Sequence, residues 1–370
     1  MFAQGTHLAS TPLCAQPNGT RRAARQPMLV RATYAAEAPP QSSKGTGMSQ
    51  LGALKTMSTI VADTGEIESI RSFKPIDCTT NPSLLLKAAQ NPIYHHFLDE
   101  AVAADDHFET PRPESNITDI LAVNIGCELL KIVPGRVSTE CDANLSYDTQ
   151  ATIDKGLRIM DLYSKKGIDP KRIYIKIAST WEGIRACEEL QKQGIDTNMT
   201  LLFSFGQAAA CADAGAALIS PFVGRIMDWY KAKEGRSFEP HEDPGVKSVQ
   251  RIYKYYKQYG YRTIVMAASF RNVGEITELA GCDNITIAPA LLKQLEDSME
   301  PLERKLWPTM GDCDEPKVDL TAGQLETFKK LHGEDQMAVD KLKEGIDGFA
   351  KDQIKLEAMV HEITEGLGKR

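Results

Sequence analysis

One lysine lies in the middle of a short stretch that is typical of a buried β-strand. In residues 172–178, RIYIKIA, the isoleucines occupy every second position and Lys176 falls on the opposite face. Side chains alternate between the two faces of a strand, so we expect Lys176 to point away from the isoleucine face, into the interior of a barrel. Burial disfavours the charged form of a lysine and exposes a nucleophilic amine. The alternative, a structural lysine held in a buried ion pair, stays open on this strand alone.

Other predicted strands end in polar residues spaced two apart, which keeps the members of each pair on one strand face. In a barrel of parallel strands the carboxyl ends open into one mouth, where such enzymes have their active sites. Any single pair is also compatible with an ordinary strand terminus, but together with Lys176 the pairs favour a site. They are Thr79 with Asn81, Ser138 with Glu140 and Asp142, Asn198 with Thr200, Ser220 with Phe222, and Ser269 with Arg271.

The elements that would position these residues form a repeat of strands and helices. From about residue 50, short β-branched or apolar runs alternate with longer segments of helical period. Eight such strands predict an α/β fold, a (β/α)8 TIM barrel. An open doubly wound sheet is the second choice, because no GxGxxG and no GxxxxGK[ST] follows any strand. The predicted strands cover residues 58–62, 75–80, 136–141, 172–178, 198–204, 217–221, 262–268 and 284–288.

A long amphipathic helix is expected to end the fold. Apolar residues recur at near-helical spacing across residues 335–366, with lysines and glutamates between them. We expect this helix to pack against the exterior of the barrel. A role as a catalytic lid is the alternative, which no feature of the sequence supports. The apolar residues are Val339, Leu342, Ile346, Phe349, Ile354, Met359 and Ile363.

The composition argues against several classes of function. The formal net charge is -7, so the chain has no overall positive field for nucleic acid or an anionic membrane surface. No apolar stretch approaches the roughly 20 residues of a membrane-spanning helix. The cysteines and histidines are dispersed, without CxxC or HExxH spacing. The sequence therefore predicts no metal site and no cofactor.

The N-terminal segment has the composition of a transit peptide. Residues 1–36 contain four arginines, many small or hydroxylated residues, and no lysine or acidic residue. A merely disordered tail is the alternative. The sequence VRA at 30–32 resembles the processing site of plastid precursors. We expect residues 1–32 to be removed on import into the chloroplast (plastid stroma), with the mitochondrion as the alternative destination, residues 33–49 to form a linker, and residues 50–370 to form a single catalytic domain.

Seven runs of the sequence resemble the motifs of the transaldolase family. They occur in the family's order, within a resemblance that extends from about Leu51 to the C-terminus, and they fall on every predicted strand but one. No departure occurs at a position that the family uses for chemistry. The runs are VADTGE at 61–66, CTTNPSL at 78–84, GRVSTE at 135–140, IKIASTWEGI at 175–184, LLFSF at 201–205, ISPFVGR at 219–225 and ASFRN at 268–272.

The resemblance implies transfer of a dihydroxyacetone unit from sedoheptulose 7-phosphate or fructose 6-phosphate to glyceraldehyde 3-phosphate or erythrose 4-phosphate, in the pentose phosphate pathway. It implies that Lys176 attacks the ketose carbonyl and holds the three-carbon fragment as a Schiff base. Glu140 and Thr200 would share a water that moves protons while the carbinolamine forms and collapses. Asp63 would handle the proton of the C4 hydroxyl during cleavage.

The resemblance also implies how the sugar phosphate is held. Arg225, Ser269 and Arg271 would bind the terminal phosphate, because arginine donates two parallel charge-assisted hydrogen bonds to such an anion. Three other residues would hydrogen-bond the sugar hydroxyls, although each is also compatible with capping at the end of a strand. These are Asn81, Asn198 and Ser220.

Phe222 bears on the choice between two related reactions. Related Schiff-base aldolases are expected to have a tyrosine there that helps water enter, so phenylalanine favours transfer over simple release of the fragment. A fructose 6-phosphate aldolase remains the second enzymatic alternative. A non-catalytic sugar-phosphate-binding barrel predicts losses at Lys176, Glu140 or Asp63, and all three are present. The resemblance further suggests a homodimer.

Overall fold

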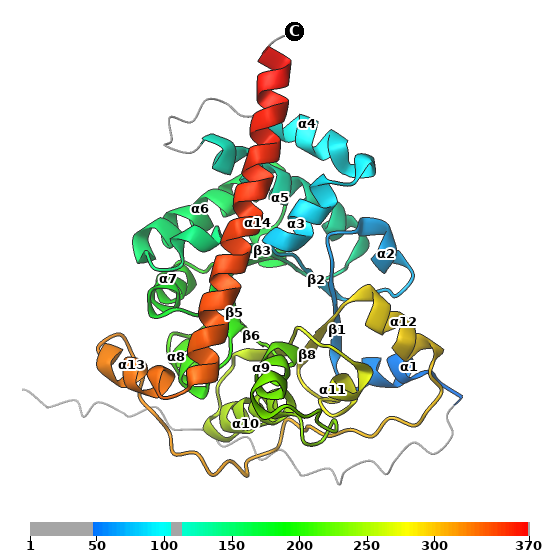
Figure 1. The fold of residues 1–370 in the computed structure, drawn as a ribbon, viewed down its shortest axis with the longest axis vertical. Coiled ribbons are helices and arrows are strands. Elements are labelled where there is room, and N and C mark those ends of the chain that lie inside the picture. The colour runs from blue at the N-terminus through cyan, green and yellow to red at the C-terminus, as the bar shows by residue number, and fades with distance from the viewer. Residues whose placement is uncertain (1–46, 105–112, 369–370) are drawn as a thin grey trace, which may run out of the picture. The chain divides into compact units, whose positions relative to one another are not determined.

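The computed structural model describes residues 47–104 and 113–368, which are coloured in Figure 1. The described residues belong to one compact unit. The predicted transit peptide, residues 1–32, and nearly all of the predicted linker lie outside the described residues. The boundaries at 32 and 49 therefore stay predictions.

Eight parallel strands close into a barrel in chain order, with β8 pairing back onto β1. This confirms the predicted α/β barrel. Each strand overlaps its predicted range, and the ends differ by two residues at most. The strands are β1 (Thr59–Asp63), β2 (Asp77–Thr79), β3 (Val137–Glu140), β4 (Ile173–Ala178), β5 (Thr197–Leu202), β6 (Leu218–Pro221), β7 (Ile264–Ala267) and β8 (Asn284–Ile287).

Helices surround the barrel (Figure 1). Many begin at a side chain that caps the first turn, since an Asn, Asp, Ser or Thr oxygen accepts a hydrogen bond from a free backbone N–H. Asn81, Thr180 and Ser204 do this where the chain leaves the carboxyl ends of the strands. The helices are α1 (Gln50–Lys55), α2 (Ile67–Arg71), α3 (Pro82–Ala89), α4 (His95–Ala103), α5 (Pro113–Ile132), α6 (Thr149–Lys165), α7 (Trp181–Lys192), α8 (Phe205–Asp213), α9 (Gly224–Glu234), α10 (Pro244–Tyr259), α11 (Val273–Thr277), α12 (Pro289–Asp297), α13 (Leu325–Gly333) and α14 (Gln336–Gly368), with 3-10 turns η1 (Pro92–Tyr94), η2 (Ala143–Leu145) and η3 (Pro170–Arg172).

The barrel has separate inner and outer apolar layers. The isoleucines of β4 pack outward in the large core beneath the helices. Tyr174, on the opposite face of β4, packs inside the barrel with Val61, Leu218 and Met266. The period of two in β4 therefore assigns its faces as predicted, and Lys176 lies on the inner face, one step further toward the carboxyl end.

The long C-terminal helix does more than cover the barrel exterior. α14 crosses the barrel in Figure 1, and its first half packs Leu342, Ile346 and Phe349 against apolar residues at the ends of β5 and β6. The predicted packing against the barrel exterior is present, on α3 and α5, but it is incomplete, because α14 also covers Phe203 and Phe222 at these strand ends. The helix therefore forms part of the barrel mouth.

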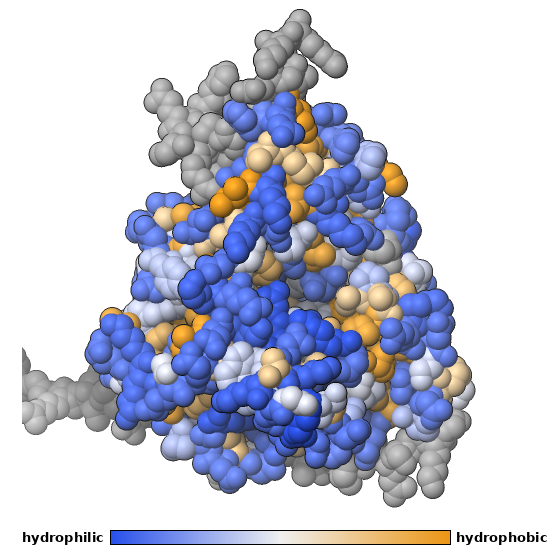
Figure 2. All heavy atoms as spheres, viewed as in Figure 1, coloured by the Kyte–Doolittle hydropathy of each residue, from blue (hydrophilic) through white to orange (hydrophobic). Residues whose placement is uncertain are grey.

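One residue assigned to the apolar face of this helix is misplaced. Ile354 is 55% exposed, whereas Gln353 is buried and its Nε2 donates to Oγ1 of Thr118 on α5 at 2.8 Å. The buried face runs through residues 346, 349, 353, 356 and 360, so a polar residue occupies a position where the pattern expected an apolar one. Figure 2 shows apolar residues gathered beside the C-terminal half of α14. Within the described residues, no helix is both long and apolar enough to span a membrane.

Candidate active site

A small polar cavity of about 50 Å³ opens at the carboxyl ends of the strands. Eight of the eleven predicted site residues line it, and Phe349 of α14 lines it as well. Of the remaining three, Glu140 contacts Lys176 and Asn198 contacts Ser220, while Arg271 lies at the exposed rim. The eight are Asp63, Asn81, Lys176, Thr200, Ser220, Phe222, Arg225 and Ser269.

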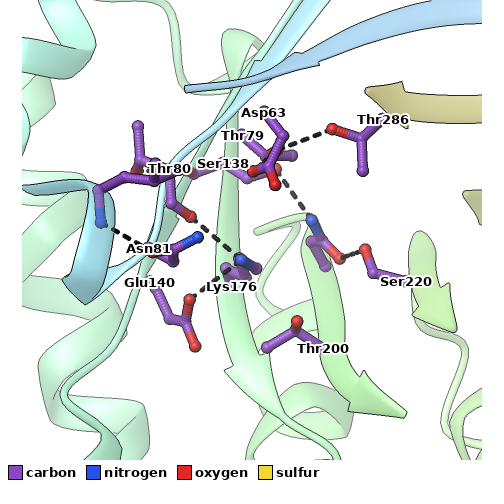
Figure 3. A network of polar contacts seen from close by, with 12 residues as sticks. Asp63, Thr79, Thr80, Asn81, Ser138, Glu140, Lys176, Thr200, Ser220 and Thr286 are labelled. Carbon is purple, nitrogen blue, oxygen red and sulfur yellow. Dashed lines mark hydrogen bonds and ion pairs between the residues drawn. The ribbon is translucent and has the colours of Figure 1, made fainter. Parts of the chain in front are cut away.

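The Lys176 amine lies between a carboxylate and a backbone carbonyl (Figure 3). Nζ is 3.0 Å from Oε2 of Glu140 and donates to the carbonyl oxygen of Thr80 at 3.1 Å. Glu140 and Lys176 are direct neighbours in the register of β3 and β4, which brings the two side chains together. Their side chains are only 3% and 6% exposed. The buried ion pair that the sequence left open is thus present, and its lysine lines the cavity.

Burial raises the pKa of the Glu140 carboxyl, while the positive charges of Lys176 and Arg225 oppose this rise. The Oε2 atom of Glu140 forms the ion pair but accepts no aligned hydrogen bond from the described residues. Thr200 Oγ1 is likewise buried without a hydrogen-bond partner in the part of the chain that the structure describes. Both atoms therefore retain hydrogen-bonding capacity, Glu140 Oε2 beside the amine and Thr200 Oγ1 on a residue that lines the same cavity as Lys176.

A chain of hydroxyls holds Asp63, the last residue of β1. Thr79 Oγ1 donates to Oδ1 of Asp63 at 2.9 Å, and the hydroxyls of Thr79 and Thr286 are 2.9 Å apart. Since Thr79 donates its only proton to Asp63, Thr286 must donate to Thr79. Thr286 lies on β8, and its inward position there was the only signal of this role in the sequence.

Two asparagines are fixed in different ways. Nδ2 of Asn198 donates to Ser138 Oγ at 3.0 Å, and its Oδ1 accepts from Ser220 Oγ at 2.6 Å. Asn81 Oδ1 caps α3 by accepting from the backbone N–H of Leu84 at 2.9 Å. Because capping uses only Oδ1, the amide Nδ2 of Asn81 can still donate into the cavity that this residue lines. Capping and a site role are therefore compatible.

Arg225 lines the cavity next to tightly packed backbone, with Arg271 nearby. The Arg225 guanidinium lies 5.0 Å from the Phe222 ring and 5.5 Å from the Phe349 ring. Burial lowers its pKa, and the nearby positive charge of Arg271 lowers it further. Gly224 begins α9 here and donates its N–H to the Ser269 carbonyl at 2.9 Å. A Cβ at Gly224 would lie 2.5 Å from the Arg271 side chain, so only glycine permits this approach.

Arg271 points toward a carboxylate at the rim. Its Nη2 and Nε lie 2.8 Å and 3.0 Å from Oδ2 of Asp228. The side chains of Arg271 and Asp228 are 40% and 41% exposed. The structure therefore brings Arg271 near Arg225 but not into the cavity.

Glu275 supports the Arg271 loop from behind, and the sequence interpretation missed it. This fully buried carboxylate accepts the backbone N–H of Arg271 at 2.7 Å, while its own N–H donates to Asn272 Oδ1 at 3.0 Å. Burial raises the pKa of Glu275 to about 7, although its carboxylate accepts backbone hydrogen bonds from Arg271 and Asn272 that lower it, and the neighbouring Asp243 carboxyl raises it further. The only sequence signal was a glutamate three residues after a helix-capping asparagine.

Stability is expected to fall with rising pH because of Glu275. Between about pH 4.5 and pH 7 the folded chain keeps a proton that the unfolded chain has lost, so the free energy of unfolding decreases across this window. The full effect above pH 7 is of order 3 kcal/mol, at 1.36 kcal/mol per pKa unit. Glu275→Gln cannot ionise, so its stability relative to the wild type should rise from pH 5 to pH 8 in urea unfolding. The exposed Glu300→Gln is the control, and parallel curves for Glu275→Gln and wild type would contradict this prediction.

Comparison with known proteins shows what the chain is similar to. Residues 60–360 match the protein family described as transaldolase/fructose-6-phosphate aldolase. Transaldolase A of Pasteurella multocida (strain Pm70) is 59% identical over 314 residues, which are 84% of this chain and 98% of the relative. A transaldolase of Actinobacillus pleuropneumoniae serotype 3 (strain JL03) is 58% identical over 85% of this chain and 99% of its own length. One of Yersinia pseudotuberculosis serotype IB (strain PB1/+) is 55% identical over the same shares.

Proposed function

The chain belongs to the transaldolase/fructose-6-phosphate aldolase family and is a transaldolase, and we propose that Lys176 is the amine that carries the transferred fragment. The fragment is a dihydroxyacetone unit, taken from sedoheptulose 7-phosphate or fructose 6-phosphate. It is passed to glyceraldehyde 3-phosphate or erythrose 4-phosphate. The observation that carries this proposal is the buried amine of Lys176, 3.0 Å from Glu140 and facing a polar cavity.

Glu140 and Thr200 act in formation of the Schiff base. Lys176 must lose a proton before its amine can attack the ketose carbonyl, and the adjacent Glu140 accepts this proton. The carbinolamine hydroxyl then leaves as water. A water held by Glu140 and Thr200 relays the protons, and the remaining hydrogen-bonding capacity of Glu140 Oε2 and Thr200 Oγ1 supports this role.

Asp63 acts when the carbon–carbon bond breaks. The C4 hydroxyl gives its proton to Asp63 and becomes the aldehyde of the released aldose, while the bonding electrons move into the iminium on Lys176. The resulting enamine keeps the three-carbon unit on the enzyme. In the second half of the reaction the enamine carbon attacks the acceptor aldehyde, Asp63 returns the proton, and water releases the new ketose from Lys176. The hydrogen bond from Thr79 holds Asp63 in place for both halves.

Substrate binding divides between the two ends of the cavity. Asn81, Asn198 and Ser220 bind the sugar hydroxyls, supported by the fixed orientation of Asn198 between Ser138 and Ser220. Arg225, Ser269 and Arg271 bind the terminal phosphate, supported by the closeness of both arginines to the N-terminus of α9. Arg271 shares its guanidinium between the phosphate and Asp228. Phe222 packs beneath Arg225 and keeps that wall of the cavity apolar.

Arg271→Ala is expected to weaken the use of phosphorylated donors by about 1.5 to 3 kcal/mol in kcat/KM, the range for hydrogen bonds to charged groups. The loss should be absent with unphosphorylated fructose as donor, because that sugar lacks the anion. Asp228→Asn is the matched variant, since it removes the competing carboxylate from Arg271. Equal losses with both donors would assign Arg271 a different role.

The proposed reaction is tested by a coupled assay of residues 33–370 with fructose 6-phosphate and erythrose 4-phosphate. Sedoheptulose 7-phosphate and glyceraldehyde 3-phosphate should form in equal amounts. The second candidate, a fructose 6-phosphate aldolase, would release free dihydroxyacetone without any acceptor. Phe222 in an apolar wall of the site favours transfer. Release of free dihydroxyacetone as fast as transfer to the acceptor would overturn the preference for transfer over simple aldol cleavage.

We also propose that the chain is a plastid precursor and that the mature enzyme is a homodimer. The family match begins only at residue 60, and the relatives cover at most 85% of the chain although nearly all of their own length aligns. The acid-free, arginine-bearing residues 1–36 lie wholly before the family match. Mass spectrometry of the protein after import into isolated plastids should find an N-terminus near residue 33, and import by mitochondria instead would favour the other destination.

The proposed homodimer is tested by light scattering, in which the mature enzyme should have twice the mass of one chain.

A further inference from the structure

A second cavity of the described chain lies at the end of the barrel opposite the catalytic mouth. Its volume is about 640 Å³, within the range of small-molecule sites and far above the 50 Å³ at the mouth. Its walls include the first residues of three strands, Thr59, Ile264 and Asn284. The inner apolar layer of Val61, Tyr174, Leu218 and Met266 fills the barrel between the two cavities. A ligand here would therefore not touch Lys176.

The cavity is strongly basic in an acidic protein. It is lined by five cationic side chains and one carboxylate, whereas the whole chain carries a formal charge of -7. Like charges gathered in one concave surface raise the local potential and attract anions. The cationic residues are Lys55, Lys74, Lys257, Arg262 and Arg304, and the carboxylate is that of Asp283.

Three of these cations already have partners in the fold. Lys257 pairs with Asp283 at 2.7 Å, Lys55 donates to the Phe73 carbonyl at 2.6 Å, and Arg304 donates to the Leu306 carbonyl at 2.7 Å. These three therefore have structural roles, and Lys257 neutralises Asp283. They still contribute positive charge to the wall.

Lys74 and Arg262 are different, because neither forms a hydrogen bond or ion pair with the described part of the chain. Both side chains are exposed and line the same cavity. Their charges are thus available to a ligand. They come from segments that precede β2 and β7, so only the folded barrel brings them to one cavity.

The backbone at Lys74 gives an independent reason to expect function. Three non-glycine residues among those described have a positive φ, and Lys74 is one of them, at +48°. The other two are Ser269 and Leu201, which belong to the phosphate end and the β5 end of the catalytic mouth. Such conformations are unfavourable for residues with a side chain and cluster at ligand sites. Lys74 is also followed by Pro75, which restricts it further.

We propose that this basic cavity, centred on Lys74 and Arg262, is a second anion site that binds a phosphorylated small molecule carrying at least two negative charges. The five cations suit a multiply charged ligand better than a monoanion. The cavity volume admits a sugar bisphosphate or a nucleotide, which share this chemistry. The site is separate from the proposed transfer reaction and does not depend on it.

Binding of three probes tests the proposal: pyrophosphate, fructose 1,6-bisphosphate and adenosine triphosphate, measured by titration calorimetry on the full chain. The wild type should bind at least one probe. The probe that binds most tightly shows whether the site prefers an inorganic phosphate, a sugar bisphosphate or a nucleotide. Lys74→Gly and Arg262→Gln should each weaken binding about tenfold or more, as expected for loss of a charge-assisted hydrogen bond. Lys74→Gly also removes the unfavourable φ, so its thermal midpoint should not fall.

Two controls separate this site from other anion sites. Lys171→Ala removes one exposed charge from the turn before β4, outside the cavity, and should leave binding unchanged. Arg271→Ala removes charge at the catalytic mouth and should also leave it unchanged. Binding that survives both Lys74→Gly and Arg262→Gln, binding that is lost in Arg271→Ala, or no binding of any probe would each overturn the proposal.

Discussion

Lys176→Arg is expected to lower transaldolase turnover by at least about 10⁴-fold, the scale seen when a covalent nucleophile is removed. Arginine keeps the positive charge that pairs with Glu140, so the buried carboxylate is not left uncompensated. A guanidinium stays protonated and cannot form a Schiff base. The loss would therefore reflect chemistry rather than folding, and thermal unfolding of the variant should show this directly.

Borohydride trapping locates the covalent bond. Wild-type protein reduced in the presence of fructose 6-phosphate should carry a three-carbon adduct on the peptide that contains Lys176. Lys176→Arg should carry none, whereas Lys171→Ala, at an exposed lysine that does not line the catalytic cavity, should be labelled as the wild type is. An adduct on another lysine of active enzyme would refute the assignment.

The sequence predicted the barrel well because its strands carry strong local signals. In β4 the isoleucines alternate without interruption, so the inner face and the place of Lys176 on it followed from the period alone. Strand ends were predicted within two residues, since glycines, prolines and helix caps flank the apolar runs. Local pattern thus determined which residues could face the mouth.

Contacts between distant segments were less predictable. The 3.0 Å approach of Glu140 to Lys176 depends on the register of β3 against β4, which no single strand specifies. The carbonyl of Thr80 became a partner of Lys176 through its backbone, which leaves no trace in residue type. Arg271 was expected at the phosphate but pairs with Asp228, on a helix 43 positions earlier in the chain.

The C-terminal helix shows a different limit. Periodicity identified α14 but could not say that Phe349 would lie at the mouth, because the same apolar face could have packed on any part of the barrel. Gln353 interrupts the pattern, and only its hydrogen bond to Thr118 explains why a polar residue is buried there. The basic cavity could not be predicted from the sequence either, because Lys74 and Arg262 are far apart in the chain and come together only in the closed barrel.

Substitution of Glu140 and substitution of Asp63 should slow different steps of the reaction. Glu140→Gln keeps the size of the side chain but removes the base next to Lys176, so adduct formation itself should slow by about 10²- to 10⁴-fold. Rapid quench with borohydride measures that step. A normal rate of adduct formation in Glu140→Gln would show that another group accepts the proton.

Asp63→Asn is expected to capture the donor without cutting it. The amide oxygen of asparagine can still accept the hydrogen bond from Thr79, so the geometry of the site is kept while the base is lost. Attack by Lys176 proceeds, but no group takes the C4 hydroxyl proton, and turnover should fall by about 10²- to 10⁴-fold. A covalent complex that retains the whole sugar should then accumulate. Intact mass spectrometry after borohydride reduction distinguishes a six-carbon adduct of fructose 6-phosphate from the three-carbon adduct of the wild type. If Asp63→Asn carries only the three-carbon adduct, cleavage does not require Asp63, and its proposed role is wrong.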